Sequence, residues 1–183
     1  MFERYLVQHC SPTLAALKTA NMFCFPFSSE EDLKRQLRIW NERLERKGVS
    51  LLLLRVRKKS AMIYVFRRFL LQRDLSDPQT AYFLSCCGYP DTGADDALGH
   101  LKRRLLEKEN FPHEIGLFLG YPLRDVIGFI RNEGKNCKCA DCWKVYGDER
   151  EAKKIFEAFR KCREVYLRLW KEGRSVSNLT VAA

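Results

Sequence analysis

The sequence predicts an α+β fold, with a small, mainly antiparallel sheet of about four strands packed by helices in two layers. Amphipathic segments, with apolar residues every three or four positions, are separated by short runs rich in β-branched and aromatic residues. In VSLLLLRVRKKSAMIYVFRRF two such runs flank RKKS, which is typical of an antiparallel hairpin. A strand–helix–strand connection near the C-terminus could be parallel, which would make the sheet mixed.

Length and composition favour one domain over residues 1–183. We expect an N-terminal segment with a short helix at 1–27 and a frayed tail at 174–183. Hydrophobic residues make up 46% and charged residues 31% of the chain, which is ordinary for a globular protein. No run approaches the roughly 18 apolar residues of a membrane helix, and the first 20 residues lack a signal-peptide pattern. The expectation is a cytoplasmic protein with no membrane partner.

Capping patterns predict the first two helices. Ser11 followed by Pro12 predicts the start of a short helix that runs to residue 18. Ser28 and Glu31 have the spacing of a capping box. That second helix would end at Gly48. Its buried stripe would be Leu33, Leu37, Trp40 and Leu44.

The second half of the chain is expected to alternate helices with strands. The predicted helices cover residues 78–87 and 95–109 and the segment YPLRDVIGFIRN, and the predicted strands are EIGLFLG and WKVYG. Asp148 and Glu151 predict the capped start of a last helix, which Gly173 would end. Cys162 lies in the apolar stripe of that helix, as a small core residue does.

The net charge of +10 favours anionic partners such as nucleic acid, nucleotides or lipid surfaces. Its densest cluster is the hairpin, where strand alternation places Arg55 and Arg57 on one face. These cations could contact phosphates, with Tyr64, Phe66 and Phe69 as stacking groups. An edge hairpin that Lys and Arg keep soluble is the structural alternative. No RNA-recognition signature or helix-turn-helix pattern supports nucleic-acid binding.

Three of the eight cysteines, Cys137, Cys139 and Cys142, lie within six positions. The Cys-x-x-Cys pair has the spacing of a zinc knuckle, and a thiolate site for zinc or iron, or a redox centre, is one reading. A fourth ligand would have to come from His9, Cys10, Cys86, Cys87 or His113. Lys135, Lys138 and Lys144 are expected to lower the thiol pKa values. Three cysteines without a role in a loop are the alternative.

His113-Glu114 is not part of a His-Glu-x-x-His zinc motif, because Leu117 takes the place of the second histidine. The two side chains could still form an acid–base pair or bind a ligand. The following turn, with Gly120 and Tyr121, could face a phosphate at a helix start. Residues that satisfy backbone groups at a strand end are the structural alternative.

The third candidate is His9-Cys10 beside the expected helix start. A cysteine next to a histidine at the positive end of a helix could be a nucleophile. Adjacent side chains rarely point at each other, however, and Ser11 already has a role as a helix cap. The structural interpretation is therefore favoured.

Three runs together resemble a known family: HCSPTLAALKTANMF, FPHEIGLFLGYPLRDVIGFI and WKVYGDEREAKKIFEAFRKCREVYLRLW. They resemble domain of unknown function 3793, an uncharacterised family from anaerobic Gram-positive bacteria, over almost the whole chain. The resemblance implies a cytoplasmic, single-domain bacterial protein and no activity. It also implies that the cysteine segment varies between members, so a thiolate site would not be the shared function.

The residues that the resemblance implies are shared lie mostly at element ends, where sites are usually built. We hypothesise one cleft that joins His9 and Lys18 to the turns at residues 113–114 and 120–122. The favoured function is a binding module for an anionic small molecule, cofactor or protein partner, with ligand contacts from Lys18, Gly120, Tyr121, Arg55 and Arg57. The alternatives are a thiolate metal or redox protein and an enzyme that uses His113-Glu114 or His9-Cys10.

Overall fold

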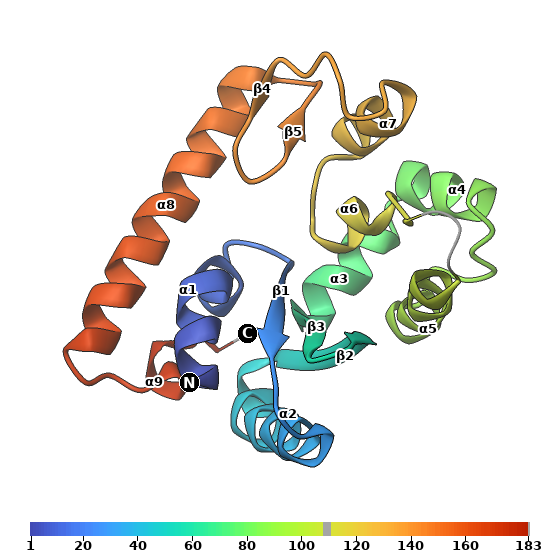
Figure 1. The fold of residues 1–183 in the computed structure, drawn as a ribbon. Helices are drawn as coiled ribbons and strands as arrows, with labels where there is room; N and C mark the ends of the chain where they lie inside the picture. Colours follow the sequence, from blue (N-terminus) through green and yellow to red (C-terminus); the bar gives the residue numbers. More distant parts are fainter. Residues whose placement is uncertain (108–110, 183) are drawn as a thin grey trace. The chain divides into compact units, whose positions relative to one another are not determined.

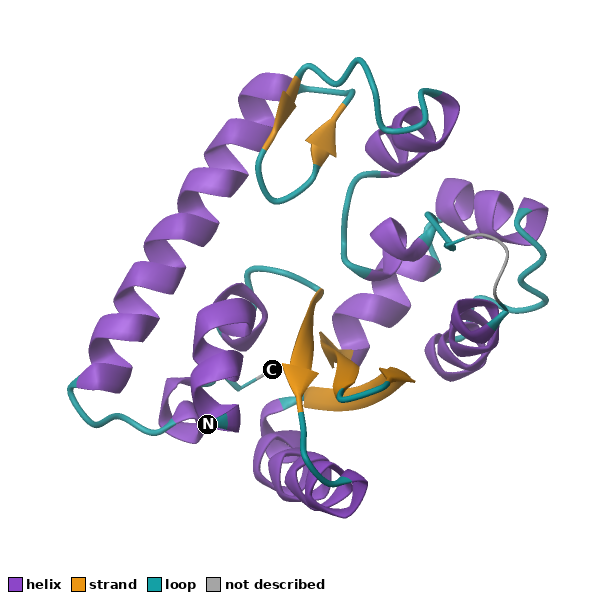
Figure 2. Ribbon diagram, viewed as in Figure 1, coloured by secondary structure: helices purple, strands orange, loops and turns teal. Residues whose placement is uncertain are grey.

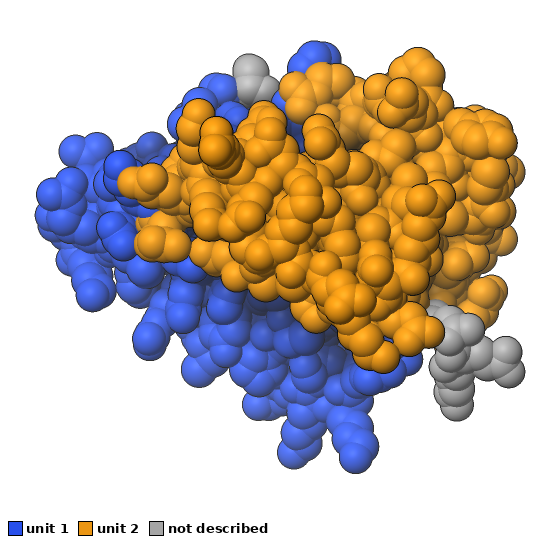
Figure 3. Space-filling model, turned by 90° about the horizontal axis from the view of Figure 1, so that it is seen from above, with its two compact units in different colours: residues 1–70, 161–183 blue, residues 71–160 orange. Residues whose placement is uncertain are grey.

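The computed structural model describes residues 1–107 and 111–182. The chain divides into two compact units, residues 1–70 with 161–183 (unit 1) and residues 71–160 (unit 2), which Figure 3 shows in different colours. The expectation of a single domain stays a prediction. Helices and two small antiparallel sheets confirm the predicted α+β class (Figure 2).

Unit 1 contains a three-stranded antiparallel sheet (Figure 1). The hairpin that the sequence predicts is confirmed as β2 (Val49–Arg57) and β3 (Ser60–Arg67), joined by a tight turn in which Lys58 has a φ of 48°. The third strand, β1 (Ala20–Pro26), was not predicted and pairs with β3, so that the order is β1-β3-β2. One edge strand of the sheet therefore comes from a segment that lies well before the hairpin in sequence.

The core of unit 1 lies between one face of this sheet and two helices, α1 (Phe2–Leu14) and α2 (Glu30–Leu44). Alternate strand residues such as Phe23, Ile63 and Val65 face these helices, as the period of a strand requires. Burying each large apolar side chain of this kind contributes about 1.5–3 kcal/mol. The expected stripe of α2 is buried at all four positions, Leu33, Leu37, Trp40 and Leu44.

The start of α2 differs from the prediction by one residue. Ser29, not Ser28, is the cap, and its side-chain oxygen accepts a hydrogen bond from the amide of Asp32. The C-terminal end is as predicted, because a short 3₁₀ helix, η1 (Glu45–Lys47), leads into Gly48 with a φ of 71°. A left-handed residue of this kind is most easily a glycine.

The start of α1 was predicted wrongly. Ser11 and Pro12 lie in its last turn and do not begin a helix. The hydroxyl of Ser11 donates to the carbonyl of Val7, one turn back, so its side chain bonds within the helix instead of capping it. The helix ends before Ala16, which has a φ of 58°.

The C-terminal segment, for which the sequence predicted a frayed tail, contains regular structure and buried side chains. A short helix, α9 (Val176–Leu179), is capped by the side chain of Ser175. Val176, Leu179 and Thr180 are buried. Packing against the core of unit 1 offsets the conformational entropy that would otherwise leave a chain end disordered.

Unit 2 is mainly helical, and one of its predicted strands is wrong. EIGLFLG contains the short helix α6 (Ile115–Phe118) in place of a strand. A short apolar run is compatible with a buried helix as well as a strand, which explains the error. The turn ends at Gly120, which has a φ of 74°.

The other elements of unit 2 agree better with the sequence. WKVYG contains only a two-residue strand, β5 (Lys144–Val145), which pairs antiparallel with β4 (Cys139–Ala140). Among the described residues the strands thus form two antiparallel sheets, of three and two strands, instead of one sheet of about four, and the connection that could have been parallel is not. Residues 108 and 109 of the expected helix 95–109 lie outside the described residues. The helices are α3 (Arg68–Leu75), α4 (Pro78–Cys86), α5 (Ala94–Leu106) and α7 (Leu123–Arg131).

The longest helix, α8 (Glu149–Lys171), begins in unit 2 and ends in unit 1. Its predicted cap is confirmed, since Asp148 accepts hydrogen bonds from the amides of Arg150 and Glu151. The predicted burial of Cys162 is confirmed as well. The first half of α8 covers a small core made with the β4–β5 hairpin, which consists of Trp143, Val145, Ala152, Phe156 and Phe159.

Within the part of the chain that the structure describes, no helix combines the length and the apolar character needed to cross a membrane.

Candidate functional site

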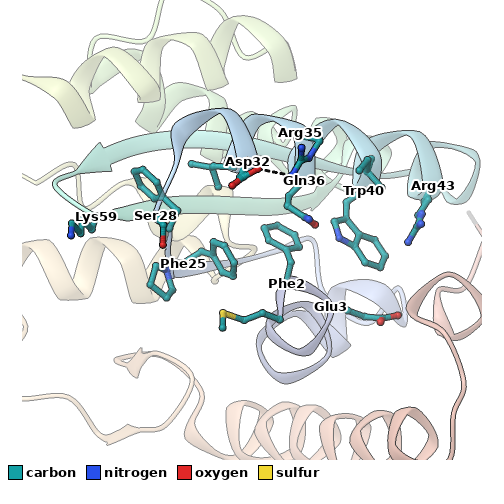
Figure 4. A pocket seen from close by; sticks show the side chains of 15 residues that line it. Phe2, Glu3, Phe25, Ser28, Asp32, Arg35, Gln36, Trp40, Arg43 and Lys59 are labelled. Atoms are coloured by element: carbon teal, nitrogen blue, oxygen red, sulfur yellow. Dashed lines mark hydrogen bonds and ion pairs between the residues drawn. The ribbon is translucent and has the colours of Figure 1, made fainter.

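One feature that could hold a ligand is a pocket of about 870 Å³ in unit 1. It lies between the start of α1, the end of β1, α2 and the β2–β3 turn (Figure 4). We call it the α2 pocket. Its floor is apolar and consists of Phe2, Phe25, Leu33 and Trp40. The rings of Phe2 and Phe25 pack edge to face, with centroids 4.8 Å apart.

Charged side chains surround this floor, and most of the acids already have partners. Asp32 forms an ion pair with Arg35. The carboxylate of Glu3 accepts a hydrogen bond from the amide of Val176, at 3.1 Å. Arg43 and Lys59 have no carboxylate partner among residues 1–107 and 111–182. With Asp32 paired to Arg35, the remaining lining charges are the carboxylate of Glu3 and the cations Arg43 and Lys59, so the pocket keeps a net positive charge.

Local structure fixes the backbone of Lys59 and the head group of Arg43. The carbonyl of Lys59 accepts a hydrogen bond from the amide of Phe27, at 3.0 Å, which ties the hairpin turn to the end of β1. The guanidinium carbon of Arg43 lies 5.1 Å from the centre of the Trp40 ring. A cation above an indole face is attracted to it, so the Arg43 head group is held at the rim.

The pair His9-Cys10 does not form a nucleophilic site in this geometry. Cys10 is 0% exposed, and burial strongly raises the pKa of its thiol. A nucleophilic cysteine needs a lowered pKa. The ring of His9 instead packs against Tyr5 and Phe23, and burial together with the charge of Arg163 lowers its pKa.

His113 and Glu114 have different surroundings, although they are adjacent in sequence. His113 is exposed, and its ring lies between those of Phe111 and Phe129. Glu114 is only 3% exposed and forms an ion pair with Arg104, at 2.7 Å. The hydroxyl of Tyr89 donates to the same carboxylate, at 3.0 Å. These contacts describe a structural ion pair and give no support to an acid–base pair.

Tyr121 and Gly120 belong to the packing of unit 2. The Tyr121 ring stacks on Trp143, with centroids 5.0 Å apart, and its hydroxyl donates to the carbonyl of Cys142. Burial, with a smaller effect of Cys142, raises the pKa of Tyr121 to about 12. Gly120 is exposed and ends the α6 turn. This arrangement explains both residues without a bound phosphate.

The hypothetical cleft would draw on both units. His9 and the buried Lys18 belong to unit 1, whereas residues 113–114 and 120–122 belong to unit 2. The shared cleft stays a prediction.

The three clustered cysteines are free thiols that lie on and beside the β4–β5 hairpin. Cys139 and Cys142 pack against the small core of unit 2. Burial, followed by the charge of Glu149, raises the pKa of Cys139, which contradicts the expected lowering. The flanking lysines explain the difference, because the ammonium groups of Lys138 and Lys144 donate to the carbonyls of Gly147 and Gly134.

Among the residues that the structure describes, these thiols are not part of a set of metal ligands. In the described ranges, no group of three or more His, Cys, Asp and Glu side chains lies in a position to hold a metal ion. Cys139 instead lines a smaller pocket of about 390 Å³, together with Lys153, Phe156 and Arg160. The cations of that pocket are paired, Lys153 with Glu149 at 2.6 Å and Arg160 with Asp141 at 3.1 Å.

The basic hairpin has fewer stacking groups than the sequence suggested. Arg57 is exposed and Arg55 partly so, in keeping with their expected common face. Tyr64 is fully buried and Phe66 nearly so, and only Phe69 is well exposed. Two of the three side chains that could have stacked on bases are therefore inaccessible.

The sequence did not point to the α2 pocket. In the sequence, Arg43 is one of several charged residues on the expected solvent-exposed face of a helix, and Lys59 is one of the basic residues clustered in the hairpin. The sequence does not show that these two cations have no carboxylate partners, because partners can come from residues distant in sequence.

A family model described as "Protein of unknown function (DUF3793)" matches residues 6–180, nearly the whole chain. No curated protein and no solved structure gave a match.

Proposed function

Because the chain belongs to this family of proteins of unknown function (DUF3793), whose description names no activity, we propose a function from the chain's own geometry. The protein binds a small anionic molecule in the α2 pocket of unit 1. The observation that carries the proposal is the placement of Arg43 and Lys59, without carboxylate partners in the described residues, beside an apolar floor.

The size and lining of the pocket support this proposal. Small-molecule sites commonly enclose about 300–1,000 Å³ and combine apolar walls with a few polar groups that fix orientation. An anion that contacts Arg43 or Lys59 would meet a cation that forms no ion pair with a carboxylate of the described residues. The attraction is stronger beside an apolar wall than in bulk water, because the wall excludes solvent from one side.

We rank anion binding above catalysis and metal binding, because the contacts of the residues proposed for those two functions give them little support. The His113-Glu114 and His9-Cys10 pairs have separate surroundings, and the clustered thiols have no ligand set for zinc or iron within the described chain. A protein or nucleic-acid partner, the cytoplasmic location and the bacterial source stay predictions.

The test is a titration of the full chain with pairs of compounds that differ only in charge. Decanoate is compared with decanol, and adenosine monophosphate with adenosine, while amide and indole NMR signals report the position of binding. We expect saturable shifts at Trp40 and α2 with at least one anion, and weaker shifts with its neutral counterpart.

The matched variants decide the position. Arg43→Gln with Lys59→Gln should weaken anion binding at least ten-fold. Lys34→Gln with Arg38→Gln removes two exposed cations of α2 that do not line the pocket and should change little. Equal binding by both double variants, or no saturable shift with either anion, would refute the proposed function.

A further inference from the structure

We infer that the ligand of the α2 pocket is an elongated aliphatic acid, with its carboxylate at Arg43 and its chain running along α2 toward Phe27. This inference rests on the proposed function, and names the class of anion that the pocket would take. Three observations carry it: the length of the pocket, the kind of apolar surface that it exposes, and the way in which Arg43 is held.

The pocket is long. The α2 residues that line it extend from Asp32 to Arg43, a distance of about 16 Å at a rise of roughly 1.5 Å per residue. Figure 4 shows Lys59 and Arg43 at opposite ends, with aromatic side chains between them. A compact anion such as inorganic phosphate could contact only one of these ends, whereas an extended molecule can follow the whole groove.

The exposed part of the lining suits a chain better than a flat ring. Phe2, Phe25 and Trp40 are only 4%, 7% and 5% exposed, because their rings pack against one another and the core. Their faces are therefore closed to a stacking ligand. The accessible apolar side chains are Phe27 and Ile39, which are half-buried, and Pro26 and Met1, which are exposed. They form a narrow strip that an aliphatic chain can cover.

The head group of the acid is assigned by the geometry of Arg43. Its guanidinium is held over the face of Trp40, at 5.1 Å, so less side-chain entropy is lost when a ligand binds. Stacking uses the face of a guanidinium and leaves its N–H edge free for a two-bond contact with a carboxylate. Lys59, at the other end, is an exposed point charge without such support.

Ile39 links the two ends, because it lies one turn of α2 before Arg43 on the same side of the helix. A chain that leaves the carboxylate at Arg43 passes Ile39 before it reaches Phe27. Each methylene that becomes fully buried on this path should increase the affinity by about four-fold, by the usual transfer free energy of a methylene. Partial burial in an open groove lowers that factor.

The experiment is a calorimetric titration of the full chain with hexanoate, octanoate and decanoate, below the concentrations at which they form micelles. Adenosine monophosphate and inorganic phosphate are titrated in parallel. We expect affinity to rise at each step of chain length and to be highest for decanoate. Arg43→Gln should weaken decanoate binding at least ten-fold, and Lys59→Gln should weaken it less.

The variant Ile39→Ser should flatten the dependence on chain length, while Leu17→Ser, which removes an exposed apolar side chain of unit 1 outside the pocket, should leave it unchanged. Both changes alter exposed or half-exposed positions, and the folded state of each variant is checked by its NMR spectrum. An affinity for decanoate that is the same in Arg43→Gln, in Ile39→Ser and in the unaltered chain would overturn the inference.

Two other outcomes separate this inference from the proposed function. If adenosine monophosphate binds through Arg43 and Lys59 while decanoate does not, the ligand class is wrong and anion binding stands. If no anion binds, both are wrong.

Discussion

The guanidinium of Arg67 donates a hydrogen bond to the carbonyl of Val181, at 2.7 Å, although the two residues are 114 positions apart. The same side chain also donates to the carbonyls of Thr13, Leu14 and Lys47. Arg67 is 2% exposed, so a buried charge is satisfied by backbone carbonyls. Thr13 and Leu14 lie at the C-terminal end of α1, where the helix dipole favours a cation. Arg67 thus joins the sheet, α1 and the chain end.

Replacing Arg67 should destabilise unit 1. Arg67→Met removes all four donors and leaves buried carbonyls without partners, which should cost about 2–4 kcal/mol. Arg67→Lys keeps the charge but cannot reach all four carbonyls, so we expect an intermediate loss. Urea unfolding followed by circular dichroism measures the change. Arg57→Met, an exposed change on the neighbouring strand, is the control, and equal losses for Arg57→Met and Arg67→Met would contradict this prediction.

Asp125 has a comparable role in unit 2. Its buried carboxylate accepts hydrogen bonds from the indole of Trp143, at 2.7 Å, and from the amides of Tyr146 and Gly147. Asp125→Asn replaces one acceptor oxygen by a donor, so at least one of these bonds is lost, at a cost of about 1–3 kcal/mol.

The measurement for Asp125→Asn is urea unfolding together with the NMR signal of the Trp143 indole, which should shift. The exposed change Glu133→Gln should alter neither. An unchanged unfolding midpoint in Asp125→Asn would show that the loop before α8 does not depend on this carboxylate.

His9 should make stability depend on pH. Its folded pKa is lowered by burial and by Arg163, so the unfolded chain binds more protons near the ordinary pKa of about 6.5. The contribution of His9 is therefore complete above that value and is lost as the pH falls toward the lowered folded pKa. We expect the free energy of unfolding to decrease between about pH 7.5 and 5.5.

The variant His9→Phe, which keeps a ring against Tyr5 and Phe23, should reduce this decrease. Arg163→Gln should reduce it by a smaller amount, because burial is the larger cause of the shift. Urea unfolding at a series of pH values measures all three proteins. A pH dependence in His9→Phe as steep as in the unaltered chain would assign the effect to other groups.

Elements with a strong local signal could be predicted from the sequence. The β2–β3 hairpin follows from two apolar runs around a short polar turn, and Gly48 and Asp148 mark helix ends by their own chemistry. EIGLFLG was predicted wrongly, because seven residues of mainly apolar character fit a buried helix as well as a strand. The strand β1 was not predicted, because it is stabilised by pairing with β3, a contact between segments far apart in sequence.

The candidate sites depended even more on tertiary contacts. The lysines around the clustered cysteines suggested lowered thiol pKa values, but Lys138 and Lys144 bond to carbonyls and burial raises the pKa of Cys139. Glu114 appeared as a partner for His113, yet its carboxylate pairs with Arg104 from a different helix. Sequence neighbours were poor guides to spatial neighbours in both cases.

The α+β class, the family, the amphipathic faces of α2 and α8 and the excess of positive charge can all be predicted from the sequence, since each depends on composition or short-range spacing. Which charges are paired and which are not follows from the tertiary contacts. Arg67 and Glu114 are buried with partners, whereas Arg43 and Lys59 line one pocket without a paired carboxylate in the described residues. The physical reason is that desolvation and charge pairing depend on distances in space, which the local period of a chain does not encode.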